Sequence, residues 1–126
     1  MQKQLIKWYQ ENKRDFPWRK DQDPYHIWIS EIMLQQTTTE TVIPYYNRFL
    51  KNFPNVEALA SASLEEVYKM WEGLGYYRRA KHIHESAQII LEKYQGVFPY
   101  EYDAILSLKG IGEYTAGAIS SIAYGK

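Results

Sequence analysis

A chain of 126 residues, 45% of them hydrophobic, is long enough for one domain with a single core and too apolar to stay disordered. Its 15 Lys and Arg residues balance 15 Asp and Glu, so it lacks the positive charge of many nucleic-acid binders, although backbone amides can bind phosphate without it. The absence of cysteine excludes disulfides and cysteine-bound clusters from this segment, and no apolar run approaches the roughly 20 residues of a membrane span.

The beginning of the sequence predicts two helices separated by a break. Residues 2–14 have a helical pattern of apolar side chains, and Pro17 then biases the preceding residue away from the α region. Asp23-Pro24 is a good start for the next helix, because a proline is tolerated in the first turn. That second helix is expected over about 25–36.

The second helix carries one carboxylate among apolar residues. Ile29, Ile32 and Met33 follow the spacing of a buried face, and Glu31 lies among them with no Lys or Arg within four positions. Burial raises the pKa of a carboxyl group unless a partner keeps it ionised, and a raised pKa suits a general acid near neutral pH. The alternative is that Glu31 lies on the solvent side of an amphipathic helix.

The rest of the sequence predicts further short helices and no strand, so the fold class is all-α with about eight helices in a single domain, 1–126. The helix starts rest on local signals: threonine caps at 37–39, a capping box in which Ser63 precedes Glu66, and a glycine break before the longest helix. The later helices are expected from 37–39 to Leu50, at 56–61, from Ser63 through Trp71, at about 76–95, near 102–108 and through Ala123.

Residues 105–123 predict a helix-hairpin-helix motif. Gly110 and Gly112 allow a turn that exposes consecutive backbone N–H groups, and the following helix points its positive N-terminal end the same way. Leu108 and Ile111 would anchor the turn in the core. Such a turn is suited to a DNA phosphate, while the alternative is a glycine turn that only reverses the chain.

Two further segments have the composition of DNA contacts. Tyr76 and Tyr77 follow the glycine break, where an aromatic ring can enter a base stack or can cap the core at a helix start. The amides of Gln35-Gln36-Thr37 can read base edges or can simply end the helix. The sequence alone leaves both pairs of alternatives open.

The first half of the 76–95 helix is rich in basic side chains. Arg78, Arg79 and Lys81 are expected on a solvated face, with phosphate contact as the alternative. His82 and His84 have no metal-ligand partners at a suitable spacing, so both are expected at the surface, facing phosphate at most, and no metal site is predicted.

Taken together, these motifs resemble the A/G-specific adenine DNA glycosylases (the MutY family) of the endonuclease III superfamily. The resemblance covers the whole chain without an evident gap and matches the N-terminal part of such an enzyme, a six-helix domain truncated on its C-terminal side. The segments that carry it are Phe16-Pro17-Trp18-Arg19, Ser30–Thr37, Thr41–Tyr46, Trp71–Tyr77 and Leu108–Ala116.

The resemblance implies a base-excision repair enzyme that flips out adenine mispaired with 8-oxoguanine or guanine and hydrolyses its N-glycosidic bond. It implies that Glu31 protonates adenine N7 and that Tyr114 faces the reacting sugar. It also implies that the adenine pocket is lined by Arg14, Trp18, Arg19 and Leu34. The opposite guanine would be contacted by Gln36, Thr37 and Leu74. Tyr76 would be the intercalating wedge, and Gly110 and Gly112 would bind phosphate.

Tyr114 also bears on the type of glycosylase. Bifunctional relatives have a lysine there, which forms a Schiff base, so a tyrosine resembles the monofunctional enzymes. Three alternatives remain: a thymine glycosylase acting on G/T mismatches, a non-catalytic helix-hairpin-helix module, and a helical protein-interaction domain. Gln35-Gln36-Thr37 favours the adenine family.

Several parts implied by the resemblance would lie beyond Lys126. They are the Asp that assists oxocarbenium chemistry, the cysteines of a [4Fe-4S] cluster and the domain that recognises 8-oxoguanine. Asp103 and Glu113 do not match the position of that Asp. The 126 residues are therefore expected to bind double-stranded DNA weakly with little turnover, as a monomer in the cytoplasm.

Overall fold

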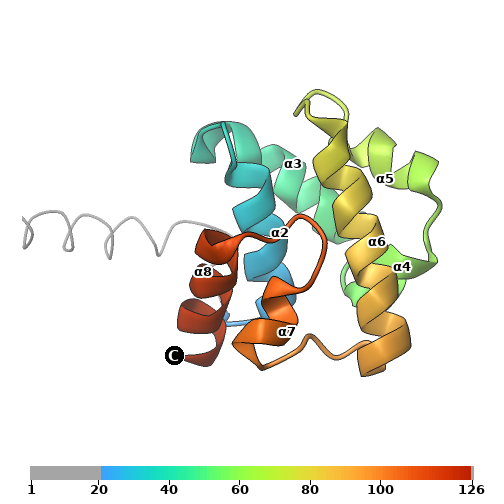
Figure 1. Ribbon diagram of the computed structural model, residues 1–126. Coiled ribbons are helices and arrows are strands. Elements are labelled where there is room, and N and C mark those ends of the chain that lie inside the picture. Colours follow the sequence, from blue (N-terminus) through green and yellow to red (C-terminus); the bar gives the residue numbers. More distant parts are fainter. Residues whose placement is uncertain (1–20, 126) are drawn as a thin grey trace, which may run out of the picture.

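The computed structural model describes residues 21–125, which form helices and contain no strand. The all-α prediction is therefore confirmed for this part of the chain, and the helix predicted at 2–14 lies outside it. The helices, labelled as in Figure 1, are α2 (Pro24–Leu34), α3 (Thr39–Asn52), α4 (Val56–Ser61), α5 (Leu64–Trp71), α6 (Tyr77–Tyr94), α7 (Tyr102–Leu106) and α8 (Glu113–Tyr124).

Helix α2 is the central element. It packs against α8 on one side and α3 on the other, while α6 lies across α4 and α5 (Figure 1). Seven of its eleven residues are buried, which makes α2 apolar on almost every side rather than along one stripe. A helix that is hydrophobic all round belongs in the middle of a fold, which is where α2 lies.

Local signals in the sequence place several helix starts. Asp23 caps α2 by accepting a hydrogen bond from the Tyr25 N–H, and Thr38 caps α3 in the same way. The Ser63 and Glu66 capping box forms with both of its reciprocal hydrogen bonds, as predicted. These caps satisfy amides that would otherwise have no partner in the first turn.

Helix α2 ends two residues earlier than predicted. Gln36 has a φ of 64°, in the left-handed region, and the helix stops at Leu34. The prediction overlooked this because Gln35 and Gln36 are good helix formers, and only tertiary contacts hold a glutamine in that conformation.

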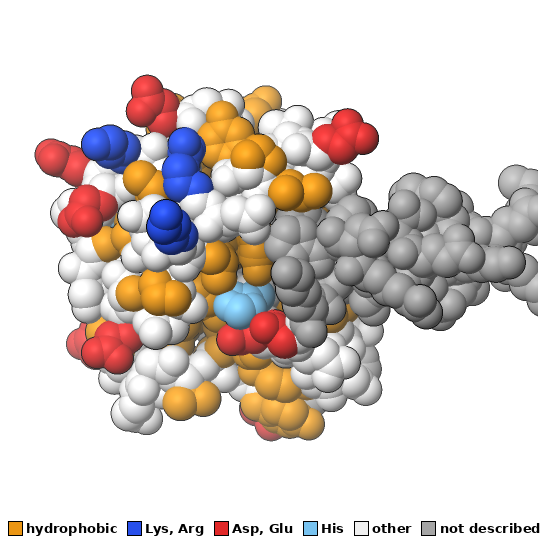
Figure 2. Space-filling view, turned by 180° about the vertical axis from the view of Figure 1, so that it is seen from behind, with side chains coloured by type: hydrophobic (Ala, Val, Ile, Leu, Met, Phe, Trp, Pro, Cys, Tyr) orange, Lys and Arg blue, Asp and Glu red, His pale blue; other side chains and the backbone are white. Residues whose placement is uncertain are grey.

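Side chains of both charges lie on the visible surface. On the face shown in Figure 2, Lys and Arg side chains form a small group, and acidic side chains lie both near the edge and close to the middle. This distribution agrees with the zero formal net charge of the sequence. None of the described helices is long and apolar enough to cross a membrane.

Candidate functional site

Two hollows of similar size lie on different sides of helix α2. The first, of about 500 Å³, is named the α2–α8 hollow, and its lining residues are Glu31, Glu113, Tyr114, Gly117, Ala118, Ser121 and Ile122. The second, of about 510 Å³, is named the α2–α6 hollow, and its lining residues are Ile32, Gln35, Gln36, Tyr76, Tyr77, Arg78, Arg79, His82, Ile83, Lys109 and Gly110. Each is large enough for one base-sized ligand.

The α2–α8 hollow contains both residues predicted to be catalytic. Glu31 is half-buried on α2, the single acid of a helix that is otherwise apolar, and Tyr114 lies in the first turn of α8 with 80% of its surface exposed. The packing of α2 against α8 brings these distant residues together. Three of the residues predicted to bind the base lie outside the described part of the chain, namely Arg14, Trp18 and Arg19.

The α2–α6 hollow contains three of the residues predicted to bind DNA. Gln36 comes from the end of α2, Tyr76 from the start of α6 and Gly110 from the turn before α8. Gln36 and Tyr76 both have a positive φ, 64° and 54°, which is uncommon for residues with a side chain. Such strain persists only where the surrounding structure holds it, and it concentrates at functional sites.

The remaining predicted residues are not among the lining residues of either hollow. Leu34 and Leu74 are partly buried and pack against the hydrophobic core. Thr37 is half-buried, and its N–H donates to the Leu34 carbonyl at 3.3 Å. Gly112 is exposed and forms the N-cap of α8.

The predicted helix-hairpin-helix is formed by α7, the turn and α8. Leu108 and Ile111 are buried, as expected of anchors in the core. Gly110 has a φ of 78°, and a Cβ added there would lie 2.9 Å from the His82 Cβ, so the turn requires glycine at this position. No described side chain caps the first amides of α8. These N–H groups at a helix N-terminus are a suitable site for an anion.

Helix α6 holds the turn of this hairpin in place. The Ser86 hydroxyl donates to the Lys109 carbonyl at 3.0 Å, and the Lys109 ammonium lies 3.5 Å from the Glu85 carboxylate. Together with the close approach of His82 to Gly110, these contacts orient the turn relative to the α2–α6 hollow. The exposed ion pair contributes little to stability, so the buried anchors and the hydroxyl contact are the main constraints.

Two predictions about the basic residues of α6 were wrong. His84 was expected at the surface but is buried, with its Nε2 2.7 Å from the Ala62 carbonyl of the segment after α4. Arg79 was expected on a solvated face but is half-buried and bonded to backbone carbonyls. Burial lowers the pKa of the Arg79 guanidinium from its ordinary value, and the nearby Tyr76 hydroxyl acts in the opposite direction.

The spacing of Arg79 in the sequence indicated that it would be buried, although the basic composition around it indicated a solvated face. Arg79 precedes Ile83 by four residues, and Ile83 belongs to the buried stripe of α6. Residues four apart project from the same face of a helix, so the Arg79 side chain leaves α6 toward the core. His82, which faces Gly110, lies beside that stripe, and His84 is inside it.

The described residues offer no obvious metal site. Among residues 21–125, no group of three or more His, Cys, Asp or Glu side chains is placed to hold an ion. The whole chain contains no cysteine, so its residues do not fit a thiolate-bound iron–sulfur cluster.

The family match and the curated relatives of this chain all belong to one class of protein, the base excision DNA repair proteins. The family described as HhH-GPD superfamily base excision DNA repair protein matches residues 29–119. The chain is 50% identical over 119 residues to the adenine DNA glycosylase of Buchnera aphidicola subsp. Acyrthosiphon pisum (strain APS), covering 94% of this chain and 34% of that protein. It is 45% identical over 131 residues to the adenine DNA glycosylase of Homo sapiens, covering 97% of this chain and 24% of that protein. The chain thus spans about a third or less of these relatives.

Solved structures share the fold. A thermostable thymine-DNA glycosylase superposes with a TM-score of 0.86 at 34% identity, covering 97% of this chain and 57% of that one. An endonuclease III–DNA complex superposes with a TM-score of 0.77 at 24% identity, covering 99% of this chain and 61% of that one. The second likeness concerns the fold alone, and both confirm the predicted all-α fold of the endonuclease III type.

Proposed function

Because the chain belongs to the HhH-GPD superfamily of base excision DNA repair proteins, we propose that it is part of a DNA glycosylase that removes adenine mispaired with 8-oxoguanine or guanine. The observation that carries the proposal is the pairing of the two hollows around α2. Glu31 and Tyr114 line one hollow, and Gln36, Tyr76 and Gly110 line the other. The proposed acid thus lies on one side of α2, and the groups proposed for recognition gather on its other side, around the end of α2.

The α2–α8 hollow has the size and chemistry to receive a flipped base. In the proposed reaction Glu31 donates its proton to adenine N7, which turns the base into a neutral leaving group. The glycosidic bond then breaks with its electron pair moving to the base, and water adds to the oxocarbenium-like sugar. Tyr114, exposed at the mouth of the hollow, would face that sugar. A tyrosine cannot form a Schiff base, so the strand stays uncut.

The α2–α6 hollow has the groups needed to read the partner base. Gln36 offers an amide donor and acceptor to a guanine edge, and Thr37 and Leu74 would contact the same guanine. The Tyr76 ring, 63% exposed, would enter the base stack in place of the flipped adenine. Gly110 and the uncapped start of α8 after Gly112 would hold a phosphate.

A second candidate function is removal of thymine from G/T mismatches. It is favoured by the TM-score of 0.86 to a thymine-DNA glycosylase at 34% identity. Both activities use the same fold and a flipped base, so the substrate preference depends on the residues that contact the base and its partner. The amides of Gln35 and Gln36 favour adenine opposite a guanine.

The experiment is a single-turnover assay of base release on duplexes that differ at one pair. Duplexes carrying A:8-oxoguanine, A:G, G:T and a matched A:T pair are compared, with base release measured by strand cleavage in alkali. Faster release from A:8-oxoguanine and A:G than from G:T supports the adenine assignment, and the reverse order supports the thymine alternative. Binding to every duplex without release of either base, by a protein that continues past Lys126, would favour a non-catalytic module.

The length of the chain is tested in the same assay. Release is compared between the 126 residues and a longer protein that continues past Lys126. We propose that the longer protein is much faster, because the second carboxylate of the reaction is supplied from that region. Equal rates would contradict this part of the proposal. The [4Fe-4S] cluster, the monomeric state and the cytoplasmic location stay predictions.

A further inference from the structure

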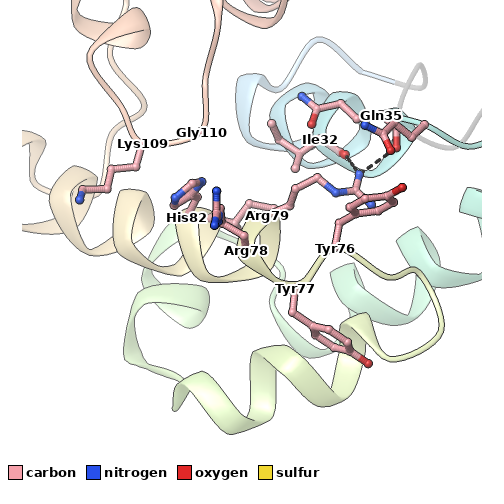
Figure 3. A pocket seen from close by; sticks show the side chains of 11 residues that line it. Ile32, Gln35, Tyr76, Tyr77, Arg78, Arg79, His82, Lys109 and Gly110 are labelled. Carbon is pink, nitrogen blue, oxygen red and sulfur yellow. Dashed lines mark hydrogen bonds between the residues drawn. The ribbon is translucent and has the colours of Figure 1, made fainter.

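Arg79 joins the end of α2 to the glycine break that precedes its own helix, α6. Its Nη1 donates to the carbonyls of Ile32 and Gln35 at the end of α2, the second at 3.0 Å, and its Nη2 donates to the Gly75 carbonyl at 3.4 Å. The guanidinium carbon also lies 5.4 Å from the centre of the Tyr76 ring. Figure 3 shows this guanidinium between the end of α2 and the Tyr76 ring.

These contacts surround the two strained residues of the α2–α6 hollow. Gln36 follows a carbonyl that Arg79 binds, and Tyr76 follows the Gly75 carbonyl that Arg79 also binds. Each of these residues has a positive φ, a strained conformation for a residue with a side chain. The backbone N–H of Arg79 also donates to the Tyr76 carbonyl at 3.0 Å, a bond that does not depend on the side chain. One side chain therefore restrains both strained positions.

The electrostatic setting favours this position for a cation. The last carbonyls of a helix have no intrahelical donor and carry partial negative charge, and Arg79 supplies donors and charge to those of α2. The face of Trp71 lies on its other side, with the guanidinium carbon 5.5 Å from the ring centre. Neighbouring Arg78 is exposed, so the two arginines of the hollow differ in what they can do.

We infer that Arg79 is a positioning residue that holds Gln36 and Tyr76 in one fixed arrangement, and that it thereby determines discrimination between a mispair and a matched pair. The inference rests on the proposed function, since Gln36 and Tyr76 are the groups proposed to read the mispair. Arg79 acts through these two residues, and Arg78 is the arginine available to phosphate.

The alternative role for Arg79 is an ordinary phosphate contact, and the two roles predict different behaviour. A phosphate contact depends on charge, so lysine would largely replace arginine. Loss of the contact would weaken binding to every duplex alike. It would also lower the salt slope, the slope of log affinity against log salt concentration, by about 1. The positioning role depends on the planar fork of the guanidinium, which bonds several carbonyls at once, so lysine cannot replace it.

The first measurement uses the protein without DNA. Amide hydrogen exchange is compared in wild type, Arg79→Lys, Arg79→Met and the control Arg78→Met. The Thr37 and Leu74 amides, which bond the Leu34 and Trp71 carbonyls, should exchange roughly tenfold faster in both Arg79 variants. The Gly96 amide at the far end of α6 should be unchanged, which shows that the variants are folded.

The second measurement is duplex affinity as a function of salt, for A:8-oxoguanine and matched A:T duplexes, in a protein of full natural length. Both Arg79 variants should lose roughly 10- to 100-fold of the preference for the mispair, with the salt slope unchanged. Arg78→Met should weaken both duplexes equally and lower the slope by about 1, with the preference retained.

The outcomes separate the inference from the function it rests on. A wild-type protein without any preference for the mispair would contradict the proposed function, and the exchange of Thr37 and Leu74 would still test the restraint. A wild-type preference that Arg79→Lys retains would overturn the inference. So would equal loss on both duplexes with a reduced salt slope, because that result describes a phosphate contact.

Discussion

The two hollows beside α2 differ in how their residues are held. The α2–α8 hollow is lined by residues of two regular helices, Glu31 from α2 and the others from α8. The α2–α6 hollow is lined largely by residues at helix ends and turns, including Gln36, Tyr76 and Gly110 in left-handed conformations. The first uses unstrained backbone, and the second needs tertiary contacts to maintain its shape.

This difference suggests a division of labour. A proton donor must be fixed relative to one bond, and a helix interior provides a rigid position. Residues that read a partner base must project from the surface, where tight turns present side chains and backbone amides. Substitutions in the α2–α8 hollow should therefore change the rate of base release, and those in the α2–α6 hollow should change binding and discrimination.

The largest effect is expected for Glu31→Gln. Glutamine keeps the shape of the side chain but cannot donate a proton to the base, so the single-turnover rate should fall by about 10²- to 10⁴-fold. Duplex affinity should stay within about twofold, because glutamine fills the same space in the α2–α8 hollow and the lost proton transfer acts on the transition state. The rate is measured on an A:8-oxoguanine duplex at saturating protein of full natural length.

Glu113→Gln is the matched control, since Glu113 lines the same hollow from the first turn of α8. It is exposed, and it should change the rate far less than Glu31→Gln. Equal losses from the two substitutions would show that the hollow responds to overall charge. The assignment of the proton to Glu31 would then be wrong.

The next largest effect is expected at the hairpin glycines, Gly110 and Gly112, which differ in backbone conformation and surroundings. Alanine at Gly110 would be strained at a φ of 78° and would place its Cβ 2.9 Å from that of His82, so the turn must shift. Strain of about 1–3 kcal/mol should appear as lower stability and weaker binding to every duplex. Thermal unfolding and duplex affinity measure the two consequences.

Gly112→Ala provides the contrast. Gly112 has a φ of −92°, and no described atom lies within 4 Å of an added Cβ, so the free protein should keep its stability. Weaker duplex binding without loss of stability would indicate that a phosphate approaches this backbone closely. Unchanged binding would limit the phosphate contact to Gly110 and its neighbours.

The two tyrosines at the start of α6 should behave differently. Tyr76 is 63% exposed, whereas the Tyr77 ring packs edge-on against Tyr68 with ring centres 5.6 Å apart. Tyr76→Ala should weaken binding to the mispaired duplex by about 1–2 kcal/mol, within the range for loss of one base stack. Tyr77→Ala should lower stability instead, as loss of an aromatic pair predicts. Reversed effects would identify Tyr77 as the wedge.

The sequence predicted the regular parts of the molecule well. Capping residues such as Asp23 and Ser63 and the apolar run of α2 are local signals, and they identified the helices and the burial around Glu31. The hairpin was also predicted, because Leu108 precedes its two glycines and Ile111 lies between them at a recognisable spacing. These features depend on residues close together in the chain.

The failures share a physical reason. Arg79 and His84 were expected at the surface, because a cluster of basic residues usually marks a solvated face. Their positions depend on carbonyls that other segments supply, those of Gln35 and Ala62. The left-handed conformation of Gln36 is likewise imposed by tertiary contacts, so no local pattern predicts it.

The smallest effect is expected in the α2–α8 hollow, whose lining residues come from regular helices. Gly117 lies inside α8, has no described atom within 4 Å of an added Cβ, and lines the α2–α8 hollow. Gly117→Ala should therefore raise the free energy of unfolding by about 0.5–1 kcal/mol, because alanine loses less conformational entropy in a helix. Gly125→Ala is the opposite case, since Gly125 ends α8 at a φ of 68° and alanine there should destabilise. Denaturant unfolding of both variants measures the difference. If Gly117→Ala lowered stability, the wall of the α2–α8 hollow would be strained, and the contrast between the two hollows would no longer hold.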